Sequence, residues 1–248
     1  IGSGPFTVAD FQPGHSLKLA RSDTYHGTKA ASNVVEFMQY SDADALSKAL
    51  TDGSLDMAAP VSASTATGLN GKDGLTVKEG ATTDKVLLAY NNGTDSLLSD
   101  EQARKAFRYQ IDAAGIASAQ PDAAGALGGP ISLLEPGYED LTGLYPHDEN
   151  QAGQMFSYFG AQYLTTVNLV VPEEYRSLAE TIKQQIERQP RPTVNLEVLS
   201  DEDYAKRIKD GKWELTVMSM DGTDDAGIFA DPDSMFHYDH TEAQQAYA

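Results

Sequence analysis

The C-terminal half of the chain alternates strand and helix patterns, and this alternation restricts the fold more than any other feature. Three short segments, at 167–171, 194–198 and 215–219, have the period of two that is typical of a strand. The pattern is formed by Val167, Leu169 and Val171, by Val194, Leu196 and Val198, and by Leu215, Val217 and Ser219. Apolar residues at helical spacing separate these segments, over 175–186 and around Tyr204 and Ile208, and Ser200 is the expected cap of the second helix. Alternating strands and helices form a sheet with helices on its faces, so residues 166–220 predict a three-layer α/β unit. Ligands of such sheets bind beyond the carboxyl ends of the strands.

The first 60 residues predict a smaller group of elements. Apolar residues on either side of Pro13 and Gly14 indicate a β-hairpin over 6–19. Residues 34–59 predict a β-α-β unit, in which Ser41 caps the helix, Gly53 ends it and residues 55–58 form the second strand. Residues 60–84 are rich in Ser, Thr, Gly and Asp, which is typical of an exposed connection or hinge.

After the β-α-β unit at 34–59 and the polar connection, a second α/β region begins with a strand at 86–90. Ser99 and Gln102 have the spacing of a capping box, and the apolar residues behind them predict a helix. Asp148 precedes another helical pattern, which we expect to end at Gly160. Two α/β regions joined by a polar connection are a common way to build a ligand cleft between two lobes.

The composition excludes several classes of function. The formal charge of −19 would repel a phosphate backbone, so nucleic acid is not an expected partner. The chain has no cysteine for a thiolate zinc site, and no apolar run long enough to cross a membrane. It starts at Ile1 without a signal sequence, which indicates an internal fragment or a processed product.

No motif selects a catalytic residue, a metal site or a cofactor. The turn at residues 2–6, GSGPF, lacks the third glycine of a dinucleotide-binding loop and precedes a strand. The HYDH stretch at 237–240 has metal-binding residue types, but a histidine spacing of three on an irregular segment favours a solvated surface. We therefore expect no catalytic residues, no bound metal and no cofactor.

Five motifs, in order, resemble the family 5 extracellular solute-binding proteins of ABC importers for oligopeptides, dipeptides and nickel. They are GSGPF at 2–6, GSLD at 53–56, LLAYNNGTDSLLSDEQARKAF at 87–107, HDENQAGQMFSYFG at 147–160 and FADPDSMF at 229–236. The third motif carries most weight, because it combines a strand ending in Asn91 with a helix that bears Arg104 and Ala106.

The resemblance implies a periplasmic-binding-protein-like (type II) α/β fold with two lobes and mixed sheets flanked by helices, in an incomplete chain. Residues 1–85 would be part of the first lobe with a hinge-proximal connection, and residues 86–248 most of the second α/β lobe. The implied function is capture of a solute, most readily a peptide, and its delivery to an ABC permease in the membrane. The full-length protein would be a monomer, extracellular or periplasmic, and anchored to the membrane as a lipoprotein.

The resemblance also implies where the solute would bind. The segment before the Asp-Pro motif contributes acidic and aromatic contacts in the family, and the matching candidates here are Asp221, Asp224, Asp225 and Phe229. A carboxylate there would form a charge-assisted hydrogen bond with a ligand amine. An acidic solvated loop is the alternative. Asn91 is a further candidate, which would face the cleft or satisfy backbone groups at the hinge, and Arg104 is expected to form a structural ion pair.

Two other functions are compatible with the same fold. One is the ligand-sensing domain of a regulator, and the other is a hydrolase built on this scaffold. The hydrolase would need a nucleophile and a base that face the cleft, and the sequence selects neither. We therefore expect a binding protein that is not an enzyme.

Overall fold

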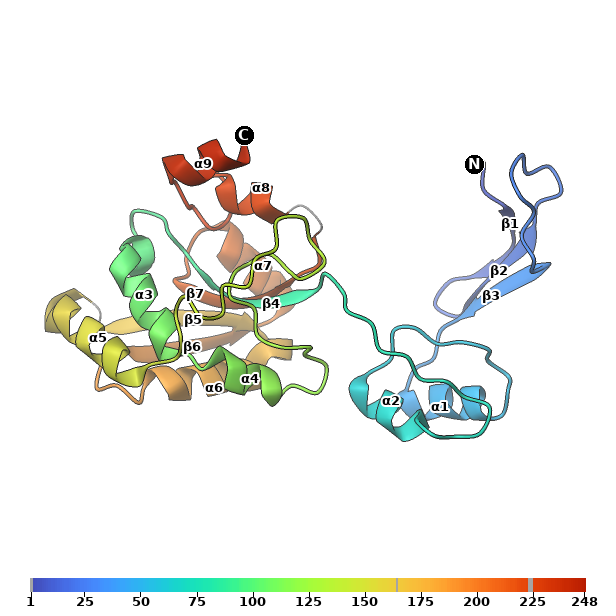
Figure 1. The fold of residues 1–248 in the computed structure, drawn as a ribbon, viewed down its shortest axis with the longest axis horizontal. Helices are drawn as coiled ribbons and strands as arrows, with labels where there is room; N and C mark the ends of the chain where they lie inside the picture. The colour runs from blue at the N-terminus through green and yellow to red at the C-terminus, as the bar shows by residue number, and fades with distance from the viewer. Residues whose placement is uncertain (1, 164, 223–224) are drawn as a thin grey trace. The chain divides into compact units, whose positions relative to one another are not determined.

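The computed structural model describes residues 2–163, 165–222 and 225–248, which form two compact units. Unit 1 contains Ile1–Glu79, and unit 2 contains Gly80–Ala248 (Figure 1). Each unit has its own sheet. Among the described residues, no helix combines the length and the apolar character that a membrane crossing requires.

Unit 1 is built on a three-stranded antiparallel sheet. Its strands are β1 (Phe6–Gln12), β2 (Ser16–Arg21) and β3 (Val34–Met38), in the order β1-β2-β3. The predicted hairpin is therefore confirmed, and Gly14 in its turn has a φ of 72°. Helices α1 (Ala43–Thr51) and α2 (Ala63–Leu69) follow the sheet.

The prediction of a β-α-β unit over residues 34–59 is wrong. Residues 55–58 form no strand, and β3 pairs with β2 in the antiparallel direction. After Gly53, with a φ of 77°, the chain turns back so that the amide of Leu55 donates to the carbonyl of Ala49 at 3.0 Å. The short apolar run at 55–58 therefore continues the C-terminal cap of α1. The sequence alone does not distinguish a strand from a helix end in so short a run.

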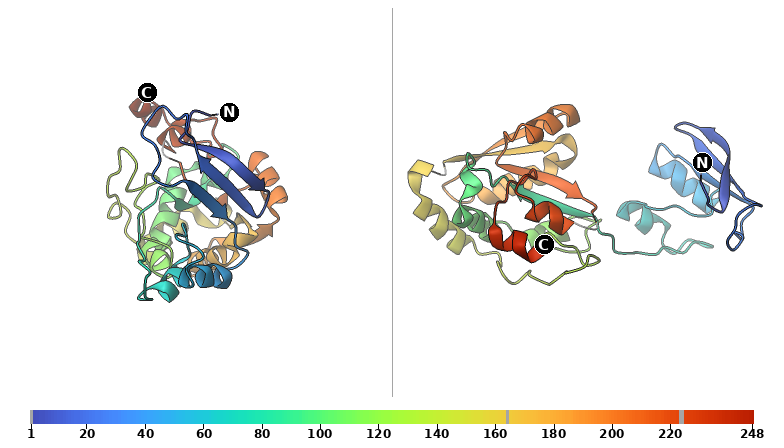
Figure 2. Two further views of the ribbon diagram at one scale, coloured as in Figure 1. Left: turned by 90° about the vertical axis from the view of Figure 1, so that its right-hand side faces the viewer. Right: turned by 90° about the horizontal axis from the view of Figure 1, so that it is seen from above.

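Unit 2 is an α/β structure around a four-stranded mixed sheet. Its strands are β4 (Lys85–Tyr90), β5 (Thr166–Pro172), β6 (Thr193–Leu199) and β7 (Leu215–Met220), in the order β4-β7-β5-β6. Strands β5, β6 and β7 are parallel, and β4 is antiparallel to β7. Figure 2 shows β4 and β7 side by side, in green and orange-red. The predicted strand segments of unit 2 are thus confirmed.

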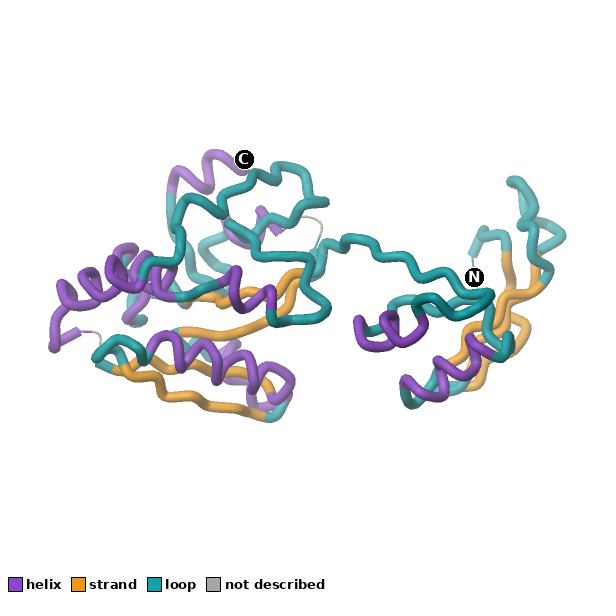
Figure 3. Tube along the Cα trace, turned by 60° about the horizontal axis from the view of Figure 1, so that its bottom comes forward, coloured by secondary structure: helices purple, strands orange, loops and turns teal. Residues whose placement is uncertain are grey.

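The helices of unit 2 cover both faces of this sheet, as Figure 3 shows. They are α3 (Glu101–Gln110), α4 (Ala113–Ser118), α5 (Glu149–Tyr163), α6 (Arg176–Ile186), α7 (Asp201–Lys209), α8 (Asp225–Ala230) and α9 (Thr241–Tyr247), with short 3-10 turns η1 (Leu97–Ser99) and η2 (Glu173–Tyr175). Alternate residues of β5 point to opposite faces: Leu169 packs with α3, α5 and α6, whereas Val170 packs with Trp213 and α7. The three-layer prediction is confirmed.

Several helix ends differ from the sequence-based expectations by a residue or more. The side chain of Asp100, and not Ser99, caps α3, because it accepts from the amide of Gln102 at 2.7 Å. Asp42 caps α1 in place of the predicted Ser41. Helix α5 runs past the expected end at Gly160 to Tyr163. Ser200 caps α7 as predicted.

Candidate functional site

The carboxyl ends of the three parallel strands lie together at one edge of the unit 2 sheet. We call this the carboxyl edge. Pro172 at the end of β5 pairs with Leu199 at the end of β6. Strand β4 starts at the same edge, because it is antiparallel to β7 and its Lys85 pairs with Met220. The segment that follows Met220 therefore projects from the edge where sheets of this kind place their ligands.

Asp221 is exposed at the carboxyl edge. It directly follows β7, and its backbone carbonyl accepts a hydrogen bond from Thr83 Oγ1 at 3.3 Å. That bond ties the chain entering β4 to the chain leaving β7, while the Asp221 carboxylate remains in solvent. Asp224, the next candidate from the sequence, lies outside the described residues.

Asp225 is buried and forms an ion pair within the chain. Its side chain is 2% exposed, and its Oδ2 lies 2.8 Å from the ammonium of Lys85. Lys85 is completely buried and also contacts the carboxylate of Glu135, which is 3% exposed. We call these three residues the buried charge cluster. It attaches α8 and the loop around Glu135 to the first residue of β4.

Both Lys85 and Glu135 are charged at neutral pH in this environment. Burial by itself would raise the pKa of Glu135, but hydrogen bonds from Lys85 and Ser132 outweigh it and hold the pKa at about 2. Burial would lower the pKa of Lys85, yet its contacts with Asp225 and Glu135 raise it. The backbone amide of Ser132 donates to Glu135 Oε2 at 2.6 Å. The cluster thus combines the charged Glu135 and Lys85 with Asp225, and the formal charges of the three side chains sum to −1.

Phe229 belongs to the apolar packing of unit 2. Its ring stacks on that of Phe236, with the centroids 4.9 Å apart, and it packs against the core face formed by Val170 and Trp213. Phe229 also lines a shallow apolar hollow together with Tyr238 and residues of α8 and α9. Its candidate role as a ligand contact stays a prediction.

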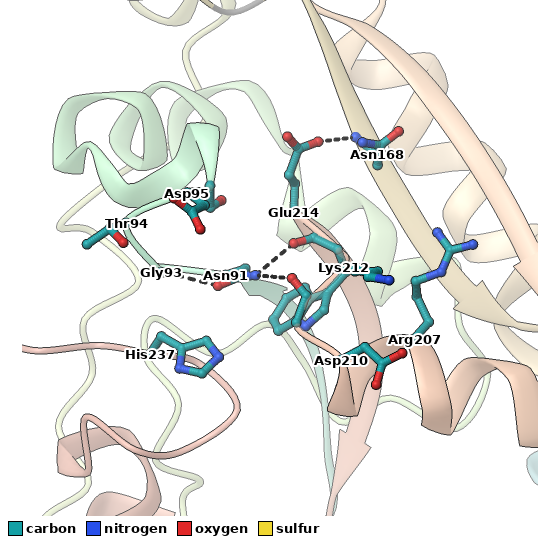
Figure 4. Close-up of a pocket in the computed structure, with 13 residues that line it drawn as sticks. Asn91, Gly93, Thr94, Asp95, Asn168, Arg207, Asp210, Lys212, Glu214 and His237 are labelled. Carbon is teal, nitrogen blue, oxygen red and sulfur yellow. Dashed lines mark hydrogen bonds between the residues drawn. The ribbon is translucent and has the colours of Figure 1, made fainter.

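Asn91 lies at the opposite edge of the sheet, where β4 ends. Its amide nitrogen donates to the carbonyls of Gly211 at 3.1 Å and Trp213 at 2.8 Å, and its Oδ1 accepts from the amide of Gly93 at 2.9 Å. Figure 4 shows these bonds in the wall of a polar hollow of about 550 Å³. The side chain is therefore committed to holding the loops of this edge together.

Of the four described candidates, the structure brings Asp221 and Asp225 together, packs Phe229 against apolar residues and places Asn91 at the opposite edge. Asp221 and Asp225 both belong to the carboxyl edge, whereas Asn91 follows the far end of β4. A six-residue strand spans roughly 17 Å at about 3.4 Å per residue, too far for one small solute to contact both ends directly. Asn91 would therefore affect solute binding only indirectly, by maintaining the shape of the sheet.

The sequence-based reasoning missed Lys85 and Glu135. A lysine at the start of the apolar segment KVLLAY was the only available signal, since strands seldom bury an unpaired lysine. Glu135 lies in a long loop between α4 and α5 and has no pattern around it.

Arg104 has a structural role, but the predicted ion pair is not what holds it. Its guanidinium donates to the backbone carbonyls of Leu98 at 2.8 Å and Ser99 at 2.9 Å, and it lies 5.8 Å from the centre of the Tyr238 ring. These contacts fix the turn before α3. The sequence could not predict these contacts, because their acceptors are backbone carbonyls, which every residue has.

The sheet order and the helices on both faces together define unit 2 as a three-layer α/β unit with a mixed sheet. The chain belongs to the bacterial extracellular solute-binding proteins, family 5 Middle, whose family model matches residues 1–245. A comparison with curated protein sequences finds no match.

Solved structures with the same fold include three binding proteins. The substrate-binding protein CtaP from Listeria monocytogenes aligns with a TM-score of 0.81 and 16% identity over 99% of this chain and 53% of its own. NikA from Brucella suis, in complex with Fe(III)-EDTA, gives 0.76 and 16% over 99% and 58%. The oligopeptide-binding protein AppA from Bacillus subtilis, in complex with a nonapeptide, gives 0.66 and 17% over 98% and 53%.

These comparisons confirm the predicted family and the periplasmic-binding-protein-like fold. The chain spans a little over half the length of these three structures. At such low identity these structures show the fold alone, so their bound solutes do not identify the solute of this chain.

Proposed function

We propose that this chain forms part of the solute-capturing subunit of an ABC importer and that the carboxyl edge of unit 2 contacts the solute. The observation that carries the proposal is the position of Asp221, an exposed carboxylate directly beyond a parallel strand in a member of a solute-binding family. In this proposal residues 1–85 contribute to the first lobe and its hinge, and residues 86–248 form most of the second lobe.

A peptide is the solute class that we favour. An extended peptide can satisfy its own main-chain groups by pairing with exposed backbone, which gives affinity with little dependence on side chains. Its terminal ammonium would pair with the Asp221 carboxylate in a charge-assisted hydrogen bond. One structural neighbour holds a nonapeptide and another holds a metal chelate, so metal chelates are the alternative solute class.

The proposal includes the remaining properties that the family resemblance implies. The protein would act outside the cytoplasm as a membrane-anchored monomer and deliver its solute to a membrane permease, without chemical conversion. A sensing domain of a regulator would bind solute by the same edge, but would not require a permease. Hydrolysis of the bound peptide would instead indicate an enzyme.

Solution NMR of the isotope-labelled chain tests the proposal directly. We expect trialanine at millimolar concentration to shift the amide signals of residues next to Asp221, because weak binding remains visible at that concentration. Asp221→Asn should weaken binding by roughly 10 to 100 fold, the equivalent of a hydrogen bond to a charged group. Asp210→Asn is the matched control, since it removes one exposed carboxylate at the opposite edge.

Two results would overturn the proposal. One is the absence of shifts with trialanine, a nonapeptide and a nickel-histidine chelate alike. The other is binding whose shifts map to the polar hollow around Asn91 and that Asp221→Asn leaves unchanged. Free alanine in the trialanine sample would indicate that the protein is a hydrolase and not a binding subunit.

A further inference from the structure

Charges in unit 2 are distributed unequally between the two ends of the parallel strands. The nine positions that directly follow β5, β6 and β7 are 173–175, 200–202 and 221–223, and they hold five acidic residues and no basic one. The nine positions that precede these strands hold two basic residues and one acidic residue. Because the strands are parallel, the topology gathers the acidic positions at the carboxyl edge.

Local structure accounts for part of this acidity. Glu173 pairs with Arg176 at 2.7 Å, and Asp201 and Glu202 lie in the first turn of α7. A helix N-terminus carries about half a positive elementary charge, which offsets part of one carboxylate. The partial positive charges of two helix N-termini are smaller than the charge of the five acidic residues at this edge. Asp84, which immediately precedes β4 at the same edge, adds a further exposed carboxylate. The edge therefore remains negative.

The buried charge cluster is an independent source of negative charge at the same edge. Lys85 pairs in the sheet with Met220, so the cluster lies directly beneath the start of the Asp221 segment. Its two carboxylates and one ammonium leave a formal charge of −1. Asp225 Oδ2 lies 2.8 Å from the Lys85 ammonium, which is its partner within the cluster. A charge held inside the protein is screened by salt far less than exposed charges are.

We propose that the carboxyl edge of unit 2 selects solutes that carry net positive charge, and that the excess carboxylate of the buried charge cluster contributes to this selection. The inference rests on the proposed function, because it specifies the solute class of the same edge. Among peptides the preferred ones contain lysine or arginine, and peptides with an acidic side chain are disfavoured. The cluster acts on the solute through its field, without contact.

The first experiment measures the field without requiring solute binding. Cationic and anionic nitroxides of equal size are added separately to the labelled chain, and the paramagnetic relaxation of each amide proton is compared. Amides at Asp84, Glu174 and Gly222 should relax faster with the cationic probe, and a potential of one kT makes the ratio about seven. Amides next to Arg191 and Lys212, at the other edge, should show a smaller ratio. Equal ratios at the two edges would overturn the inference.

The second experiment measures selection with three peptides that differ in one side chain. Ala-Lys-Ala, Ala-Ala-Ala and Ala-Glu-Ala are titrated at low and high ionic strength, and we expect the lysine peptide to bind about five to ten times more tightly than the alanine peptide. Glu135→Gln removes the excess buried charge but leaves the Lys85 and Asp225 pair balanced, so it should fold and lower this ratio. Asp210→Asn changes the total charge equally at the opposite edge and should leave the ratio unchanged.

The outcomes separate the two proposals. If no peptide binds, the proposed function fails and the nitroxide ratios alone decide whether the negative edge exists. If all three peptides bind with equal affinity, the proposed function stands and the inference of charge selection is overturned. If Glu135→Gln and Asp210→Asn reduce the ratio equally, the overall charge of the protein causes the preference, and the assignment to the buried charge cluster is overturned.

Discussion

The buried charge cluster predicts an unusual cost for one substitution, Lys85→Met. Methionine fills a similar volume, but it leaves Glu135 and Asp225 buried without their shared cation. Removing one partner of a buried ion pair costs about 3 to 5 kcal/mol. The low pKa of Glu135 gives a similar figure, because a shift from 4.5 to about 2 corresponds to about 3 kcal/mol.

The pH dependence provides a second, independent check of the same reasoning. The folded pKa of Glu135 is below its unfolded value, so its contribution to stability is present above about pH 4.5 and is lost as the pH falls through 2. At pH 3 about 2 kcal/mol of that contribution should already be gone. Lys85→Met lacks the contribution at every pH, so the stability difference between the two proteins should shrink on acidification.

Urea denaturation at pH 7 and pH 3 measures both effects. Trp213 is the only tryptophan of the chain and is 2% exposed in unit 2, so its fluorescence follows the unfolding of that unit. Lys105→Met is the matched control, because it breaks a more exposed pair with Glu101 and should cost about 0.5 kcal/mol or less. A cost for Lys85→Met below about 1 kcal/mol at pH 7, or a difference that does not shrink at pH 3, would refute the reasoning.

Three further predictions concern packing and capping in unit 2, and each is measured by the same urea assay. Asp100→Ala should cost about 1 kcal/mol because Asp100 caps α3, and Ser99→Ala should cost clearly less; equal costs would contradict the capping assignment. Phe107→Ala should cost about 3 to 5 kcal/mol, since the ring is fully buried, and a cost near 1 would show that the core refills the space. Asn91→Ala should cost about 2 kcal/mol and alter Trp213 emission, because the side chain bonds the Trp213 carbonyl; unchanged emission would argue against that bond.

The sequence determined the elements that have a strong and local signal. The strands over 166–172, 193–199 and 215–220 were predicted because apolar residues recur at every second position within them, and Ser200 was found because a cap lies next to the helix that it starts. Errors occurred where two local solutions have similar energies. Asp100 and Ser99 are both good capping residues, and the apolar run at 55–58 fits a strand as well as a helix cap.

The tertiary structure alone decided which distant residues meet. Lys85 is 50 residues from Glu135 and 140 residues from Asp225, so no local pattern connects them. Their meeting depends on β4 lying antiparallel to β7, which brings the start of one strand to the end of the other. The sequence placed Asp221 beyond a strand, but only the fold showed that Asp221 is exposed, that Asp225 is buried and that Asn91 lies at the opposite edge. The physical reason is that burial and electrostatic pairing depend on spatial neighbours, whereas helix and strand patterns depend on neighbours along the chain.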